Sequence, residues 1–372
     1  MKILLLGEYS NVHATLARGL RQLGHQVTVA SNGDYWKDYP RDIDLARHEG
    51  TLGGLRLAAR LLSLLPRLRG YDVVQLVNPV FADHKAERLL PMYRYLRRHN
   101  GKVVLGAMGM DWYWVHTCTT EKPLRYSDFN IGEQLRTDET ALREQREWLG
   151  TPKERLNRLI ADDCDAIVTI LYEYDVCYRP HFPEKTHFIP LPIGSMCPIR
   201  TISPISPIGP MSPIKLFIGI SRGRSAYKGT DIMLRAAENI VARYPDRVDL
   251  CKAEGIPFYE YQQLIEGSDV LLDQLYSYTP SMNTLLAMSK GIVCVGGGEP
   301  ENYEIIGETE LRPIVNVQPT YESVYHELEQ HVLHPERLPE LKRQSIEYVH
   351  RHHDYVKVAR QYETLYCSLL NA

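Results

Sequence analysis

Short, continuous apolar runs alternate with segments of helical periodicity along the first half of the chain. The first run, 3–6, ends at Gly7 and precedes apolar side chains at helical spacing, at Val12, Leu16, Leu20 and Leu23. Further runs lie at 27–30, 73–77, 102–105 and 166–170. A continuous apolar run is typical of a parallel strand that is covered on both faces. Strands and helices that alternate in this way predict an α/β domain with a parallel sheet.

The same alternation begins again near residue 215. Apolar runs follow at 215–220, 248–250, 269–272, 292–295 and 314–315, with a helical pattern at 231–242 among the segments between them. A last helical pattern runs from about 356 to 370. The expected fold class is therefore α/β, with two Rossmann-like doubly wound domains. Such domains leave a crevice at the carboxyl ends of their strands, where ligands bind.

A proline-rich stretch separates the two series. Its prolines lie between residues 189 and 213, at Pro190, Pro192, Pro198, Pro204, Pro207, Pro210 and Pro213. Proline fixes φ and cannot donate a ladder hydrogen bond, so this stretch is predicted to be a stiff interdomain connector. A PxxP partner-binding segment is the alternative. The expected division is a first domain at 1–190, a linker at 191–213, a second domain at 214–355 and a C-terminal helix at 356–372.

Composition narrows the class of protein. The formal net charge of the 372 residues is −3, which argues against a nucleic-acid partner. The seven cysteines lack metal-type spacing and suit reduced thiols, so we expect no protein-held metal. The first apolar run is too short for a signal peptide, and no run approaches the ~20 residues of a membrane span. A cytoplasmic protein is expected.

The loop after the first strand excludes common nucleotide-binding motifs. Residues 7–12 contain one glycine, whereas a dinucleotide-binding loop has the pattern Gly-x-Gly-x-x-Gly, and no P-loop pattern occurs. The first strand of the second domain leads instead into a basic loop that contains Arg222, Gly223, Arg224 and Lys228. Glycine permits close approach of a ligand, and the cations suit phosphate oxygens near a helix N-terminus. The loop predicts a diphosphate site; a solvated basic loop is the alternative.

Other strand ends of the second domain add polar candidates. The loop after 269–272 contains Ser281 and Asn283, which we expect to contact a diphosphate or a sugar. Three glycines at 296–298 precede Glu299 and Glu301, whose alternative role is favourable charge at a helix N-terminus. Backbone groups near Ile256 are candidates for contact with a nucleotide base.

These segments resemble the GT-B glycosyltransferases, and specifically the retaining enzymes of glycosyltransferase family 4. The resemblance rests on the opening unit with its 23–27 segment (Leu-Gly-His-Gln-Val), the basic loop at 223–229, the 287–301 helix, strand and glycine turn, and the C-terminal helix. It covers nearly the whole chain and is strongest from 215 to 305. It implies that the basic loop grips the donor diphosphate and that the C-terminal helix crosses back to the first domain.

The chain departs from the family's pattern at three positions. The family has two glutamates with seven residues between them, one near the donor sugar and one on the ribose; these places fall on Tyr278 and Leu286. The family's histidine in the first domain is replaced by Met108. The departures bear on the retaining mechanism more than on the fold.

Two residues of the first domain are catalytic candidates for activating an acceptor hydroxyl. Asp111 follows the 102–105 strand among aromatic residues; a helix or turn cap is its alternative role. His13 follows the first strand, and a structural role is its alternative. Glu8 is a weaker candidate of the same kind.

The segment 55–69 is rich in leucine and arginine and contains no acidic residue. It is expected to be a core-packing helix; a membrane-surface helix that serves a lipid-linked acceptor is the alternative.

The sequence therefore predicts a glycosyltransferase that moves a sugar from a nucleoside-diphosphate sugar to a hydroxyl of a glycan or glycolipid, as in surface-polysaccharide synthesis. The alternatives are a sugar-nucleotide epimerase with the same fold, and a non-catalytic glycosyltransferase-like scaffold.

Overall fold

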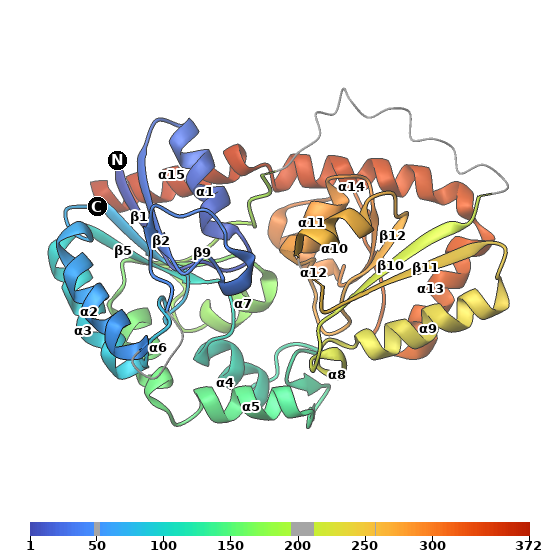
Figure 1. Cartoon of the computed structure of the whole chain (residues 1–372), viewed down its shortest axis with the longest axis horizontal. Coiled ribbons are helices and arrows are strands. Elements are labelled where there is room, and N and C mark those ends of the chain that lie inside the picture. Colours follow the sequence, from blue (N-terminus) through green and yellow to red (C-terminus); the bar gives the residue numbers. More distant parts are fainter. Residues whose placement is uncertain (48–52, 195–211, 257) are drawn as a thin grey trace. The chain divides into compact units, whose positions relative to one another are not determined.

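A computed structural model describes residues 1–47, 53–194, 212–256 and 258–372 (Figure 1). The chain divides into two compact units. The first unit comprises Met1–Pro123, Arg143–Gly194 and Asp354–Ala372, and the second comprises Leu124–Leu142 and Ser195–His353. Most of the predicted linker, 195–211, lies outside the described residues.

The first unit is built on a parallel sheet of seven strands in the order β3-β2-β1-β4-β5-β8-β9. Its inner strand β1 pairs with both neighbours, so that Ile3 lies opposite Val27 and Val73. The four apolar residues at 3–6 are fully buried, as expected for a strand covered on both faces. The strands are β1 (Lys2–Leu6), β2 (Gln26–Ser31), β3 (Ile43–Asp44), β4 (Val73–Leu76), β5 (Lys102–Ala107), β8 (Ala166–Thr169) and β9 (Thr186–Phe188).

Helices join the strands of the first unit. They are α1 (Val12–Gln22), α2 (Gly53–Leu64), α3 (Ala86–His99), α4 (Trp112–Thr120), α6 (Pro152–Asp163), α7 (Tyr172–Tyr178) and α15 (Tyr355–Asn371), with 3-10 turns η1 (Tyr35–Lys37) and η2 (Leu65–Arg67). A further helix, α5 (Glu139–Trp148), begins in the second unit and ends in the first. No helix in the described ranges is long and apolar enough to span a bilayer.

The C-terminal helix α15 packs against α1 (Figure 1). The two helices approach so closely that a Cβ atom at Gly19 would lie 2.5 Å from the Tyr355 carbonyl oxygen and 2.6 Å from the Ala359 Cβ. Farther along α15, the Tyr366 hydroxyl donates a hydrogen bond to the Gln75 side chain in β4. These contacts confirm the predicted return of the C-terminal helix to the first domain.

The second unit has a parallel sheet of five strands in the order β11-β10-β12-β13-β14. Its strands are β10 (Ile214–Ile220), β11 (Val248–Glu254), β12 (Val270–Leu272), β13 (Val293–Gly296) and β14 (Val315–Asn316). Its helices are α8 (Ser225–Lys228), α9 (Thr230–Arg243), α10 (Phe258–Ile265), α11 (Met282–Met288), α12 (Pro300–Ile306), α13 (Tyr321–Leu333), the 3-10 turn η4 (Pro335–Arg337) and α14 (Leu338–His352).

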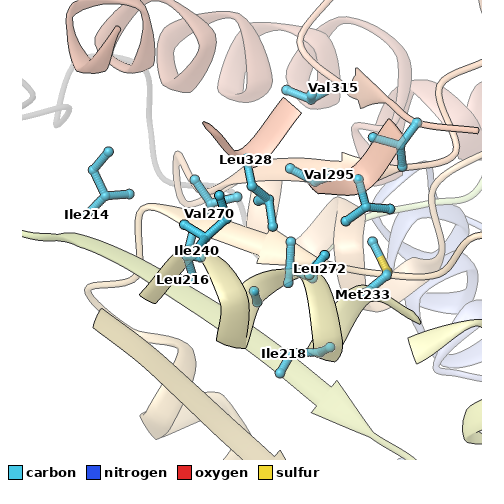
Figure 2. Packing of buried hydrophobic residues seen from close by; sticks show 14 of the residues in the cluster. Ile214, Leu216, Ile218, Met233, Ile240, Val270, Leu272, Val295, Val315 and Leu328 are labelled. Carbon is cyan, nitrogen blue, oxygen red and sulfur yellow. The ribbon is translucent and has the colours of Figure 1, made fainter. Parts of the chain in front are cut away.

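Helices cover both faces of this second sheet. On one face Leu216 and Ile218 of β10 pack with Met233 of α9 and Leu328 of α13 (Figure 2). The intervening residue Phe217 points to the other face and packs in a separate buried cluster. Because β10 pairs parallel with β12 and β12 pairs parallel with β13, the carboxyl ends of these three strands lie side by side at one edge of the sheet.

Residues 124–142 belong to the second unit, although they lie within the predicted first domain. We call this segment the arm. It contains a short antiparallel hairpin of β6 (Asn130–Ile131) and β7 (Gln134–Leu135). Polar contacts to residues distant in the sequence hold the arm in place. Such contacts cannot be predicted from local hydrophobic periodicity.

Candidate functional site

Three loops lie together at the carboxyl ends of the second unit's strands. We call them the basic loop (221–229, after β10), the central loop (273–281, after β12) and the glycine loop (297–301, after β13). The Leu275 amide donates to the Lys228 carbonyl oxygen at 3.0 Å, and the Glu299 amide donates to the Tyr278 carbonyl oxygen at 3.2 Å. The loops of parallel strands meet at this edge, as the sequence predicts.

The basic loop presents cations beside the start of the long helix α9. Gly223 and Gly229 have φ angles of +71° and +73°, which favour glycine. The Arg222 guanidinium lies against Gly255, where a Cβ atom would approach its Nε to 2.8 Å. The Arg224 guanidinium lies 5.0 Å from the centroid of the Tyr227 ring. Within the described part of the chain, neither arginine forms an ion pair.

Asp273, at the end of β12, is a charged neighbour of Lys228 that the sequence analysis did not single out. Its Oδ1 accepts a hydrogen bond from the Ser281 hydroxyl at 3.3 Å. Burial raises the pKa of Asp273 above its ordinary value, although the positive charge of Lys228 opposes this effect. Asp273 and Lys228 therefore interact electrostatically at the junction of the basic and central loops.

The remaining donor-site candidates are partly engaged in the protein. Ser281 caps α11, where its Oγ accepts a hydrogen bond from the Thr284 amide at 3.4 Å. The Asn283 amide nitrogen donates to the Tyr261 hydroxyl at 2.6 Å. Ile256 is half-buried and packs on the cluster that contains Phe217. Ser281, Asn283 and Ile256 all lie in the second unit, and each is half-buried, so part of each residue is exposed to solvent.

The acidic residues of the glycine loop are bound by the arm. Glu299 is 4% exposed, and its carboxylate accepts hydrogen bonds from the Tyr126 hydroxyl, from Gln318 at 2.9 Å and from Arg125 at 2.8 Å. Burial alone raises the pKa of Glu299, but the hydrogen bonds outweigh it and hold the pKa below its ordinary value. Glu301 accepts a hydrogen bond from Nη1 of the same Arg125 guanidinium at 2.6 Å. Glu299 is thus saturated by protein donors.

Tyr278 stands where the resembled family has its first glutamate. The residue is 1% exposed, and its hydroxyl accepts a hydrogen bond from the Arg125 amide at 2.7 Å. The Arg125 guanidinium lies 4.9 Å from the centroid of the Tyr278 ring. Leu286, at the place of the second glutamate, is half-buried in α11. At the place of the resembled family's first glutamate, this chain therefore has a tyrosine that the arm covers.

Asp111 caps helix α4 in the first unit. Its Oδ1 accepts a hydrogen bond from the Trp114 amide at 2.9 Å, and its Oδ2 accepts one from the Tyr178 hydroxyl at 2.8 Å. The residue is fully buried, and this burial raises the pKa of the carboxyl to about 6. The geometry favours the helix-cap alternative, and the catalytic role stays a prediction.

His13 is fully buried in the first turn of α1. Its Nδ1 lies 2.8 Å from the Gly7 carbonyl oxygen, which only accepts, so Nδ1 carries the proton. Nε2 faces the Gln75 amide nitrogen at 3.4 Å. Burial lowers the pKa of His13 to about 4, and the ring is therefore neutral at pH 7. This environment favours the structural alternative; a catalytic role stays a prediction.

Glu8 lies beside His13 and binds the start of α1. Its two carboxylate oxygens accept hydrogen bonds from the backbone amides of His13 and Ala14, at 3.1 and 2.8 Å. Burial raises the pKa of Glu8 to about 8. The carboxyl thus satisfies two amides that a helix N-terminus leaves unpaired.

The segment 55–69 forms part of α2 and the turn η2. Leu61, Leu64 and Leu68 are buried, which agrees with a core-packing helix, whereas Leu62 is 68% exposed. Arg60 lies 3.7 Å from Asp44 of β3. Contact with a membrane stays a prediction.

Sequence analysis missed the arm residues of this site. These residues are Arg125, Tyr126 and Arg136. Their hydrogen-bond partners in the loops lie 90 to 174 positions away in the sequence. Neither local periodicity nor a motif marks them, because their partners are set by the tertiary fold. Asp273 could have been found from the sequence, because it directly follows a predicted strand.

No protein-family model matches the chain, and no curated protein sequence matches it. Solved structures do match over the full length. A sucrose-phosphate synthase from Thermosynechococcus elongatus has a TM-score of 0.63 at 13% identity, with 100% of both chains covered. Anabaena HepE, in a complex with UDP and glucose, has a TM-score of 0.57 at 14% identity, covering 99% of this chain and 100% of that chain.

The catalytic domain of Arabidopsis thaliana starch synthase IV, bound to ADP and acarbose, has a TM-score of 0.60 at 10% identity, with 100% of both chains covered. These similar proteins are GT-B glycosyltransferases. At such low identity the likeness is one of fold. The two parallel sheets and the full-length matches together show that this chain has the α/β GT-B fold.

Proposed function

We propose that this protein is a glycosyltransferase that takes a sugar from a nucleoside-diphosphate sugar and transfers it to a hydroxyl of a glycan or glycolipid. The observation that carries the proposal is the basic loop at the carboxyl edge of the second unit's sheet. There Arg222, Arg224 and Lys228 lie in the loop that leads into α9, and the Lys228 carbonyl oxygen accepts a hydrogen bond from the central loop. The presence of UDP and of ADP in structures of similar fold supports a nucleotide ligand for this edge.

The chemistry of glycosyl transfer explains why cations belong at this place. When the bond between the sugar and the diphosphate breaks, negative charge develops on the leaving phosphate. Arginine offers paired N–H donors to phosphate oxygens, and lysine supplies a compact positive charge. In this proposal Arg222, Arg224 and Lys228 stabilise the leaving diphosphate. Gly223 lets the backbone approach it, while Ser281, Asn283 and Ile256 contribute neighbouring contacts.

Binding of nucleotides tests the donor site directly. The purified protein is titrated calorimetrically with UDP, GDP, ADP, CMP and dTDP, with and without EDTA. We expect one diphosphate to bind, with no effect of EDTA because the proposal includes no protein-held metal. The double variant Arg222→Ala/Lys228→Ala should lose that binding, whereas Arg343→Ala, an exposed arginine of α14, should retain it. A wild type that binds no diphosphate at millimolar concentration would exclude the proposal.

The finer assignment is hexosyl transfer with retention of the anomeric configuration. It rests on the resemblance to glycosyltransferase family 4, and the environment of Tyr278 and Leu286 bears against a donor contact of the usual kind. NMR of the product formed from a defined donor reads the anomeric configuration. An inverted product would exclude retention and leave the transfer itself intact.

An epimerase is the second candidate, because a putative UDP-N-acetylglucosamine 2-epimerase from Listeria monocytogenes shares the fold with a TM-score of 0.51 at 11% identity. Epimerisation needs no acceptor. Incubation with nucleotide sugar alone tests for the epimerase: conversion without an acceptor supports it, and no conversion excludes it. A scaffold without catalysis, favoured by the covered Tyr278, predicts that Arg222→Ala/Lys228→Ala leaves function in the cell intact.

Peripheral contact with an anionic membrane belongs to the same proposal, since a lipid-linked acceptor would lie at such a surface. Trp36 is 65% exposed and Leu62 is 68% exposed in the first unit, and Arg56 is also exposed. Aromatic, aliphatic and basic side chains are the groups that bind membrane interfaces. Sedimentation with vesicles that contain anionic lipid measures this contact, and recovery of all protein in the supernatant would exclude it.

A further inference from the structure

The arm contacts all three loops of the proposed donor site. Arg125 and Tyr126, near its start, bind Glu299 of the glycine loop and Tyr278 of the central loop. Arg136, after the hairpin, binds the basic loop. Farther along, the Thr140 hydroxyl lies 3.5 Å from the Gly223 carbonyl oxygen. A single segment of the chain therefore connects loops that follow three different strands.

Arg136 makes the most enclosed of these contacts. The residue is 8% exposed, and its guanidinium lies 3.6 Å from the centroid of the Tyr276 ring. Its Nη2 donates a hydrogen bond to the Ala226 carbonyl oxygen at 2.8 Å and lies 3.2 Å from Asp138. Its Nη1 donates to the Ser127 carbonyl oxygen at 3.3 Å. The side chain is thus fixed by a ring, two carbonyl groups and a carboxylate.

The position of Ala226 makes this contact relevant to the cations. Ala226 lies in α8, a four-residue turn that has Arg224 immediately before it and Lys228 as its last residue. A helix of one turn is unstable alone, because a single hydrogen-bonded turn does not offset the entropy of ordering it. The Tyr227 ring of the same turn lies 5.6 Å from the Arg136 guanidinium and 5.0 Å from that of Arg224. Contacts from outside the turn therefore stabilise it: the Leu275 amide donates to the Lys228 carbonyl oxygen, and Arg136 donates to the Ala226 carbonyl oxygen.

We propose that Arg136 is a positioning residue for diphosphate binding: it holds α8 so that Arg224 and Lys228 present their charges to the two phosphates. The inference rests on the proposed function and deepens it. Arg136 need not touch the ligand, since it acts through the Ala226 carbonyl group and the Tyr227 ring. A site whose cations are held in place before binding loses less conformational entropy when the ligand arrives.

The planar guanidinium is specific to this role. It stacks on Tyr276 with its face while its edge donates hydrogen bonds in fixed directions. A lysine at position 136 would keep the positive charge but lose the stack and the paired donors. The conservative variant therefore separates a general effect of charge from a positioning effect of shape.

Calorimetric titration of Arg136→Ala and Arg136→Lys tests the inference. The ligands are the diphosphate and the monophosphate of whichever base the wild type selects among UDP, GDP, ADP and dTDP. We expect the Kd for the diphosphate to rise about tenfold or more in both variants, and the Kd for the monophosphate to rise by less than about threefold. Arg343→Ala, in exposed ion pairs on α14, serves as the matched arginine control and should change neither Kd.

A purely structural role would raise the Kd values of the diphosphate and the monophosphate by the same factor, or would lower only the unfolding temperature. Either result overturns the inference. Should Arg136→Ala fail to fold, Arg136→Lys and Tyr276→Leu, which removes the stacking ring, give the same comparison. A wild type that binds diphosphate, together with variants that bind it equally well, overturns the inference alone. A wild type that binds no diphosphate overturns the proposed function as well.

Discussion

The hydroxyl of Tyr126 donates a hydrogen bond to the carboxylate of Glu299, which lies 173 positions later in the sequence. Together with Gln318 and Arg125, it fills the acceptor positions of a carboxylate that would otherwise be an exposed acid at the end of β13. The pair therefore joins the arm to the glycine loop, and its hydrogen bond helps to hold the pKa of Glu299 below its ordinary value against the effect of burial.

Replacing Arg125 with alanine should reduce stability mainly above the ordinary pKa of Glu299. Because the folded pKa of Glu299 lies below its ordinary value of 4.5, its stabilisation is present above pH 4.5 and is lost as the pH falls through the folded pKa. Arg125 is more than half exposed, so we expect a loss of only about 1 kcal/mol at pH 7. Urea unfolding between pH 3.5 and 7 measures it. A difference from wild type that stays constant across this range would contradict the assignment, and Arg343→Ala is the control.

Variants of Asp111 separate the helix cap from general-base catalysis. Asparagine can accept the hydrogen bond from the Trp114 amide but would place its NH2 group against the Tyr178 hydroxyl, so Asp111→Asn should lose about 1 kcal/mol. Asp111→Ala leaves both the amide and the buried hydroxyl without this acceptor and should lose about 2 kcal/mol or more. Since both carboxylate oxygens are engaged in the protein, we expect the asparagine variant to retain glycosyl transfer. Lost transfer with unchanged donor affinity would instead indicate a catalytic carboxylate.

Protonation of His13 should destabilise the first unit in mild acid. Its folded pKa of about 4 lies below the ordinary 6.5, so the stabilisation from keeping the ring neutral is present above pH 6.5 and is lost as the pH falls toward 4. His13→Asn keeps a donor for the Gly7 carbonyl oxygen but cannot be protonated. We expect the stability difference between wild type and this variant to shrink by about 2 kcal/mol between pH 6.5 and 4.5.

Glu8 acts in the opposite direction, because its folded pKa of about 8 means that its stabilisation is lost as the pH rises from 4.5 to 8. The comparison of wild type with His13→Asn cancels this effect, since both proteins keep Glu8. Chemical denaturation at four or five pH values is sufficient. Parallel stability curves would show that the ring is not buried in its neutral form.

Alanine substitutions at two loop glycines should differ strongly in cost. A Cβ atom at Gly297 would lie 2.2 Å from the Ser277 carbonyl oxygen, so the backbone must move and we expect a loss of roughly 3 kcal/mol or more. Gly223 has a φ of +71° but no heavy atom within 4 Å of the added Cβ, so Gly223→Ala should cost only about 1 kcal/mol. Unfolding free energies test the ranking, and equal losses would contradict it.

The core strands of both sheets were predictable because each is a continuous apolar run between helices. The edge strands β3 and β9 escaped prediction, since runs of two or three residues carry little pattern. In the candidate site, the basic loop was recognisable from three cations and two glycines after a strand. Arg136 and Tyr126 were not, because nothing local to residues 124–142 specifies partners such as Ala226 and Glu299.

The close packing of α15 on Gly19 has a consequence for synthesis of the chain. A nascent chain that has emerged only through residue 353 contains every strand of the first unit but lacks the helix that covers α1 and bonds Gln75. Its apolar face on α1 stays open while the whole second unit is translated, a period of some ten seconds or more at about 5–20 residues per second. Of the two units, the one whose strands are translated earlier is therefore completed later, because its last helix follows the second unit in the sequence.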